Sequence, residues 1–191
     1  MSAVLQHQSA LEQAYNRLKT SPVMSPNHNW LASMAASWCV GLSVLPDYMG
    51  LEPNQFQQLK CTYFQDDKLP EQAASGIQLD FNRMLEKEDL VKLLTRNSRA
   101  NTLEMDWLIA MIVAGCLGND HLWQDLGLWS RTQLTALLRY NFPELAAKNT
   151  KDMKWKKFLY KQLCEEEGLY LCRAPSCNVC IDYQKCYGSE E

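Results

Sequence analysis

The stretch that decides the fold is residues 101–118, NTLEMDWLIAMIVAGCLG. Asn101 followed by Glu104 resembles a capping box, in which two side chains satisfy the free amides at the start of a helix. The pair predicts a helix from Thr102 to Leu117, and Gly118 is typical of the residue just past a helix end. The longest apolar run in the chain lies in this helix and is shorter than the ~20 residues that span a bilayer. We therefore expect no membrane-spanning segment.

Most of the remaining chain also has apolar residues at intervals of three and four, which is the spacing of a helix. No segment alternates convincingly at period two, so we expect no sheet. The predicted fold class is all-α, a compact multi-helix single domain with a C-terminal cysteine-rich metal-cluster loop. The expected apolar faces are Leu11–Tyr15–Leu18; Trp30–Met34–Trp38–Leu42–Leu45, ended by Pro46; Phe56–Leu59–Tyr63, with Pro53 at the first helical position; Leu90–Leu93–Leu94; Leu134–Leu137–Leu138, after a Ser130–Gln133 capping box; and Met153–Trp155–Phe158–Leu159–Leu163, ending at Gly168.

The composition is that of a globular protein with three expected parts. Residues 1–28 form an N-terminal helix and linker, residues 29–168 a helical body, and residues 169–191 a cluster-binding loop. Hydrophobic residues make up 47% and charged residues 21% of the chain, which argues against long disorder. The net charge of -3 provides no overall positive field for nucleic acid. No secretory signal is visible at the N-terminus. We expect a cytoplasmic protein with neither a membrane nor a nucleic-acid partner.

Four cysteines lie close together near the C-terminus, Cys172, Cys177, Cys180 and Cys186, in the spacing C-x4-C-x2-C-x5-C. Thiols are kept reduced in the cytosol, so clustered cysteines there are more often metal ligands than disulfides. Thiolate is a soft ligand that suits zinc, copper(I) or iron–sulfur clusters. Structural zinc sites separate two short knuckles by a longer arm, whereas a close-spaced run is typical of an iron–sulfur loop. The spacing favours iron–sulfur and leaves zinc, redox use or a disulfide knot as alternatives.

The cysteine run also resembles the cluster loop of helix-hairpin-helix DNA glycosylases, which has the spacing C-x6-C-x2-C-x5-C. Those enzymes carry a glycine-rich hairpin followed by a catalytic lysine or aspartate. This sequence has no Leu-Pro-Gly-type hairpin, and its charge balance does not suit a DNA-binding protein.

Nearly the whole chain beyond residue 28 resembles the NifQ family. The most specific part is His-Leu-Trp-Gln-Asp-Leu-Gly at residues 121–127 together with the cysteine run. The segments that carry the resemblance are Trp30–Pro46, Asp106–Ala110, Gly115–Leu128, Asn141–Leu145, Met153–Phe158 and Cys172–Cys177.

The resemblance implies a molybdenum-processing iron–sulfur protein that donates molybdenum for nitrogenase iron–molybdenum cofactor biosynthesis. It implies a cluster carrier and not a turnover enzyme, with molybdate as the metal source and NifEN and NifH as partners. The four cysteines would hold a [3Fe-4S], [4Fe-4S] or MoFe3S4 type cluster. An iron–sulfur DNA-repair glycosylase-like protein and a zinc-stapled interaction module remain the alternatives.

Two residues outside the thiols are candidates for cofactor binding. His121 is either a molybdenum or iron ligand, or a proton donor to oxo groups, or a helix-start residue bonded to backbone or to Asp125. Asp120 is expected to cap the short helix that follows. Arg173 can donate to cluster sulfides or to an oxyanion.

Two further groups of residues have both a functional and a structural interpretation. The lysines of residues 151–161 form either a patch that attracts molybdate or an acidic partner, or a solvated helix face. The other cysteines are expected to be small buried residues, and Cys116 draws interest because it stands five residues before His121. These cysteines are Cys39, Cys61, Cys116 and Cys164.

Overall fold

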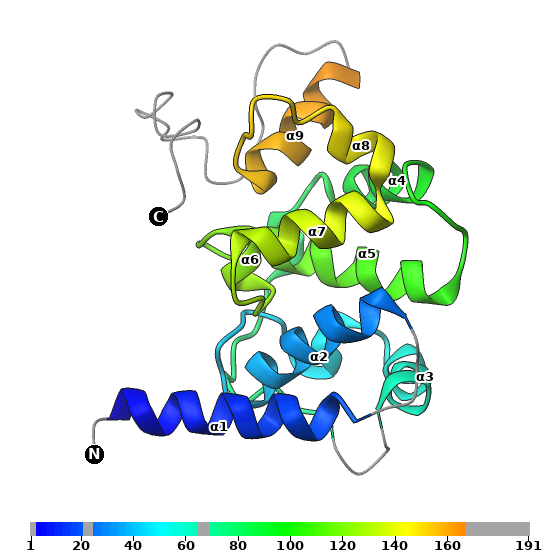
Figure 1. Cartoon of the computed structure of the whole chain (residues 1–191). Helices are drawn as coiled ribbons and strands as arrows, with labels where there is room; N and C mark the ends of the chain where they lie inside the picture. The colour runs from blue at the N-terminus through cyan, green and yellow to red at the C-terminus, as the bar shows by residue number, and fades with distance from the viewer. Residues whose placement is uncertain (1–2, 21–24, 65–68, 167–191) are drawn as a thin grey trace.

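The computed structural model describes residues 3–20, 25–64 and 69–166. Within these ranges the chain is helical and contains no strand, which confirms the all-α class for this part of the chain (Figure 1). The predicted cysteine loop lies outside the described residues. The helices are α1 (Ala3–Leu18), α2 (Pro26–Cys39), α3 (Pro53–Tyr63), α4 (Lys87–Arg96), α5 (Leu103–Cys116), α6 (Leu122–Asp125), α7 (Arg131–Asn141), α8 (Pro143–Ala147) and α9 (Trp155–Glu166), with short 3₁₀ turns η1 (Asp47–Gly50) and η3 (Phe81–Arg83).

Helix α5 confirms the helix expected over residues 102–117, and the structure places it at the centre of the core. Apolar residues cover almost its whole circumference, and ten of its fourteen residues are buried. A helix that is apolar all round is stable only when other elements surround it. Helices α3, α4 and α6 and the turn η1 pack against it. No helix in the described ranges has the length and apolar character to cross a membrane.

The start of α5 differs from the expected capping box. Thr102, and not Asn101, is the N-cap residue, and its hydroxyl accepts from the amide of Met105 at 3.4 Å. Glu104 accepts from the hydroxyl of Tyr63 and from that of Ser25, the latter at 3.1 Å. The Glu104 carboxylate therefore forms charge-assisted hydrogen bonds to two other segments, while Thr102 provides the local cap. Burial and the bond to Glu104 raise the pKa of Tyr63.

Helix α2 ends earlier than its apolar spacing predicts. The expected helix reaches Leu45, but the structure ends it at Cys39, and Gly41 adopts a φ of +77° that a helix cannot accommodate. Leu42 is consequently 47% exposed. Leu45, which lies in the loop that follows the helix, is buried. The indole N–H of Trp38 fixes this loop by donating to the Pro46 carbonyl at 3.0 Å.

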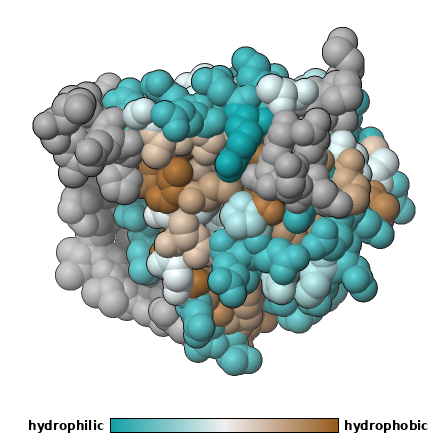
Figure 2. Space-filling view, turned by 90° about the horizontal axis from the view of Figure 1, so that it is seen from below, coloured by the Kyte–Doolittle hydropathy of each residue, from teal (hydrophilic) through white to brown (hydrophobic). Residues whose placement is uncertain are grey.

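Helix α1 lies along α2 at one edge of the body (Figure 1). Leu18 at its end is buried, and the ring of Tyr15 meets that of Trp129 edge-on with centroids 4.8 Å apart. Seen from below Figure 1, the surface is mostly hydrophilic, with several apolar areas between the polar residues (Figure 2). The expected division at residues 28 and 168 stays a prediction, because packing of α1 on the body does not locate a boundary.

Helix α9 fixes the position of the lysine-rich segment. It begins at Trp155 and not at Met153, and the expected end at Gly168 lies outside the described residues. Phe158, Leu159 and Leu163 are buried, and α9 packs on α4. Its first turn lies beside the chain that leaves α5, because the Lys156 amino group donates to the Gly118 carbonyl, and the candidate site is formed there.

Candidate functional site

The chain turns sharply between α5 and α6, and His121 lies at the end of this turn. His121 is the N-cap residue of α6, and its amide donates to Oε1 of Gln124 at 3.2 Å. The expectation that Asp120 caps this helix is wrong. The Asp120 amide donates instead to Oδ2 of Asp125 at 3.1 Å, which draws the turn over the carboxylate. His121 thus lies at the start of the helix, which is the structural alternative that the sequence suggested for it. Its role as a metal ligand stays a prediction.

Asp125 is a buried carboxylate, only 1% exposed. It forms an ion pair with the ammonium group of Lys156, which also donates to the Gly118 carbonyl at 2.8 Å. Burial raises the pKa of Asp125, and Lys156 offsets part of this rise. A Cβ atom at Gly118 would overlap the carboxylate of Asp125, so a larger residue would force that side chain or the turn to shift. The ion pair joins α9 to the turn after α5.

The start of α9 is held from a second direction. Arg131 on α7 donates to the carboxylate of Asp152 at 2.6 Å and to the Met153 carbonyl at 3.2 Å. Asp152 has a φ of +51°, which reverses the chain immediately before the helix. The segment that carries Lys154 is therefore fixed to α7 as well as to the turn.

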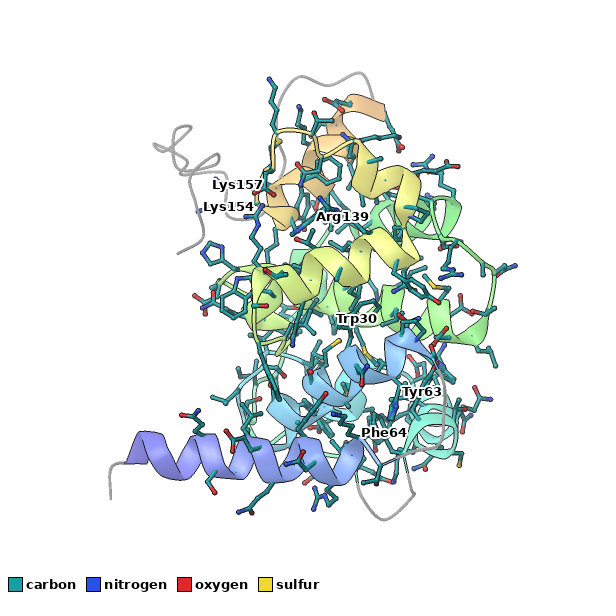
Figure 3. The ribbon with its side chains drawn as sticks, viewed as in Figure 1. Trp30, Tyr63, Phe64, Arg139, Lys154 and Lys157 are labelled. Carbon is teal, nitrogen blue, oxygen red and sulfur yellow. The ribbon has the colours of Figure 1, made fainter. Side chains whose placement is uncertain are left out.

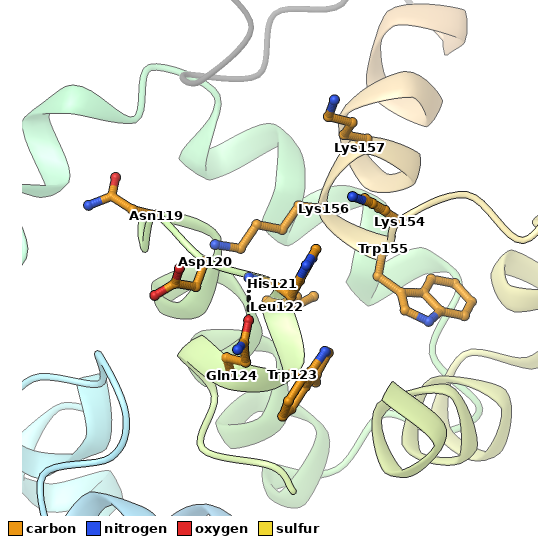
Figure 4. A pocket seen from close by; sticks show the side chains of 10 residues that line it. All are labelled: Asn119, Asp120, His121, Leu122, Trp123, Gln124, Lys154, Trp155, Lys156 and Lys157. Atoms are coloured by element: carbon orange, nitrogen blue, oxygen red, sulfur yellow. Dashed lines mark hydrogen bonds between the residues drawn. The ribbon is translucent and has the colours of Figure 1, made fainter. Parts of the chain in front are cut away.

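An open pocket of about 480 Å³ lies between these two segments (Figure 4). One wall is residues 119–124 and the other is residues 154–157. In Figure 4 the His121 ring points toward the amino group of Lys154, and Lys156 reaches across to the turn. The indole N–H of Trp123 is buried and has no hydrogen-bond acceptor among the described residues. Ligand pockets in proteins have volumes of roughly 300–1,000 Å³, and this one is within that range.

The structure divides the predicted lysine patch into two groups. Lys154, Lys156 and Lys157 line the pocket. Figure 3 shows Lys154 and Lys157 at the start of α9, far from the aromatic residues Tyr63 and Phe64. Lys151 is exposed, and Lys161 lies 3.3 Å from a carboxylate oxygen of Glu165 on the outer face of α9. Lys151 and Lys161 line a second, smaller pocket of about 210 Å³, whereas the other three line the pocket that includes His121.

The predicted metal ligands Cys172, Cys177, Cys180 and Cys186, and the predicted contact Arg173, lie outside the described residues. Their roles stay predictions. Within the described ranges, no three His, Cys, Asp or Glu side chains are arranged to hold a metal ion.

The four remaining cysteines follow the sequence expectation only in part. Cys116 and Cys164 are buried and Cys39 is half-buried, but Cys61 is exposed, which corrects the expectation of burial. Cys61 belongs to the outer face of α3, opposite the apolar face that its neighbours provide. Burial raises the pKa of Cys116 to about 12, against a smaller opposing effect of Lys156. Burial therefore disfavours the thiolate form, which is the form that binds metals.

Sequence reasoning missed the pairing of Asp125 with Lys156, which joins the two segments that form the walls of the pocket. One feature of the sequence points to such a pairing. Asp125 stands between Leu122 and Leu126 on the apolar side of a very short helix. A carboxylate in such surroundings requires a buried partner. The sequence does not show which of the lysines supplies the positive charge.

The described fold and this pocket define an all-helical protein with a basic, concave site beside its central helix. The family model NifQ matches residues 30–188, which includes all four cysteines of the C-terminal run. The chain belongs to the NifQ family, and a role in nitrogen fixation follows from that membership.

Relatives across diverse bacteria support the assignment. The protein NifQ of Azotobacter vinelandii is 42% identical over 174 residues, which cover 86% of this chain and 89% of the relative. That of Klebsiella pneumoniae is 32% identical over 168 residues, which cover 85% of this chain and 99% of the relative. A NifQ homolog of Sinorhizobium fredii is 46% identical over 99 residues, which cover 52% of this chain and 43% of the relative. No solved structure matches the chain.

Proposed function

We propose that this chain is a molybdenum-processing iron–sulfur protein that binds a Mo–Fe–S cluster. It donates molybdenum for nitrogenase iron–molybdenum cofactor biosynthesis. The observation that carries the proposal is the family match over residues 30–188, which includes the whole cysteine run. Four closely spaced thiols form the donor set that iron–sulfur clusters use, and this set fits the proposed cargo.

The protein acts as a carrier and not as a turnover enzyme. Molybdate is a hard oxyanion similar to sulfate, so binding of the free ion discriminates poorly between the two. A metal bound to sulfide is chemically distinct from sulfate, because soft sulfur ligands select thiophilic metals. We propose NifEN and NifH as the cytoplasmic partners that receive the metal.

The proposal is tested by anaerobic purification of the full chain, followed by assays for iron, acid-labile sulfide and molybdenum. We expect brown protein that contains iron and sulfide, with molybdenum below one atom per chain. Colourless protein containing one zinc ion would overturn the proposal and support the zinc-stapled module. Retardation of a DNA duplex with steep salt dependence would instead support the glycosylase alternative.

The ligand assignment is tested by changing each cysteine of the run to alanine. Cys172→Ala, or the same change at any of the other three positions, is expected to abolish metal transfer while circular dichroism retains the helical signal. Cys61→Ala is the matched control, because this exposed cysteine lies on α3 and outside the run. Loss of iron from the Cys61 variant, or unfolding of the run variants, would contradict the assignment.

A further inference from the structure

The pocket between α6 and α9 contains more positive charge than the ion pair of Asp125 and Lys156 neutralises. Lys156 and Asp125 neutralise each other, and both are held by the same turn. Lys154 also lines the pocket, and its side chain has no ion-pair partner among the described residues. The titratable groups that line the pocket or lie in contact with it are Lys154, Lys156, Lys157 and His121, against Asp120 and Asp125.

The shape of the pocket suits a small anion better than a protein surface. Lys154, Lys156 and Lys157 are half-buried and belong to the wall opposite His121, and Lys154 is the lysine nearest the His121 ring in Figure 4. A docking surface for a macromolecule is broader and places its cations at an exposed rim. The Asp125–Lys156 pair and the Arg131–Asp152 pair fix both walls, so little ordering is needed when an ion binds.

We propose that this pocket binds a tetrahedral oxodianion of the molybdate class, at a site separate from the cysteine thiols. The proposal rests on the proposed function, because it names where the metal source is received before sulfur ligands take it up. Ammonium groups donate charge-assisted hydrogen bonds to oxyanions, whereas thiolates repel such anions and bind the metal itself. One protein therefore provides a site for each of the two forms of the metal.

The geometry identifies Lys154 and His121 as the residues that contact the ion. The His121 ring and the Lys154 amino group come from opposite walls and point toward one another in Figure 4. The Trp123 indole N–H is inaccessible to solvent, so it is not part of the contact surface.

Equilibrium dialysis of the full chain with radioactive molybdate at low chloride concentration tests the site. Lys154→Gln/Lys157→Gln is expected to weaken binding about ten-fold. The control Lys148→Gln/Lys151→Gln removes the same charge from outside the pocket and should change affinity less than about two-fold. His121→Asn keeps a residue that begins helices well, so a loss of affinity in this variant reports on the ring and not on the helix.

A variant with all four cysteines of the run changed to serine separates the two proposals. Retained molybdate binding in this variant supports the pocket, whether or not the native chain carries iron. Lost binding in this variant, with normal binding in the lysine variant, would place the oxyanion at the thiols. That outcome overturns the pocket and leaves the proposed function intact.

Competition distinguishes the ions that share this chemistry. Tungstate and sulfate should displace molybdate, because charge and tetrahedral shape alone determine binding. Equal weakening by both lysine variants would show only a general electrostatic effect and would overturn the site. Normal molybdate binding by the Lys154 variant, with loss of NifEN binding, would reassign the pocket to an acidic partner.

Discussion

Helix α5 and the pocket beside α6 are neighbours in the chain, yet opposite kinds of residue build them. Helix α5 is almost wholly apolar and buried, so the hydrophobic effect alone accounts for its place. The pocket combines a buried carboxylate with several cations, and burial of such charges costs free energy that pairing only partly returns. The contrast indicates that apolar burial stabilises α5, whereas the pocket also contains Lys154, a cation that has no ion-pair partner among the described residues.

Substitution in α5 should give the largest loss of stability. Leu108 is fully buried in the centre of the core. Leu108→Ala is expected to lower the free energy of unfolding by about 4 kcal/mol, because it removes buried methyl groups and leaves a cavity. Urea denaturation measures the change, and molybdate binding by the folded variant should be unaltered. A loss below about 1 kcal/mol would show that α5 is not the centre of the core.

Breaking the ion pair should give the next largest effect, and it should depend on pH. Lys156→Met is expected to lower the unfolding free energy by about 3 kcal/mol at pH 7, because it leaves the carboxylate of Asp125 buried without a cation.

The sign of the pH dependence follows from the raised pKa of Asp125, which the substitution raises further. The folded variant then retains a proton that the unfolded chain releases above pH 3.8. Stability is therefore lost as the pH rises from 3.8 through the raised pKa. Urea denaturation across this range checks the slope, and adding Asp125→Asn to the variant should flatten it. An unchanged slope would show that Asp125 is not the group responsible.

The close approach at Gly118 should give a smaller effect that depends on Asp125. Gly118→Ala is expected to cost about 2 kcal/mol, because the added methyl group overlaps a carboxylate that Lys156 holds in place. In an Asp125→Ala background the same change should cost less than about 1 kcal/mol. A double-mutant cycle by thermal or urea denaturation measures the coupling. Equal costs in both backgrounds would show that Gly118 is required for the backbone and not for the carboxylate.

The smallest effect on stability is expected at Lys154, the lysine that we propose contacts the bound anion. Lys154→Gln should change the unfolding free energy by less than about 0.5 kcal/mol, because its side chain has no partner among the described residues. Lys151→Gln should behave alike in denaturation, since that lysine is exposed. A marked destabilisation by Lys154→Gln alone would assign this lysine a structural role and weaken the contrast with α5.

Much of the fold could be predicted from local patterns. The spacing of apolar residues and the position of Pro53 predict α3, and the same spacing predicts α4 and α5, because these signals lie within one helix. The partners of Glu104 at the start of α5 could not be predicted in the same way, because they are hydroxyls of Ser25 and Tyr63, which are distant in sequence. The end of α2 has a local cause. Gly41 has a positive φ and the Leu42 amide donates to the Ser37 carbonyl at 2.8 Å, so the glycine ends the helix although the apolar pattern continues.

The candidate site was predictable only in its separate parts. His121 and the lysines of residues 151–161 stand out in the sequence, but nothing local shows that they face one another. The pairing of Asp125 with Lys156 brings them together across 31 residues. The same fold separates Lys161 from the pocket by turning it to the outer face of α9.

The sequence by itself determined the helical class, the central buried helix and the presence of four clustered thiols. Apolar periodicity and ligand chemistry are properties of short segments, so they need no knowledge of the whole chain. Only the tertiary structure decided which lysines share a pocket with His121 and which lie away from it. That choice follows from the buried Asp125 carboxylate, whose need for a cation fixes the start of α9 against the turn that begins with Gly118.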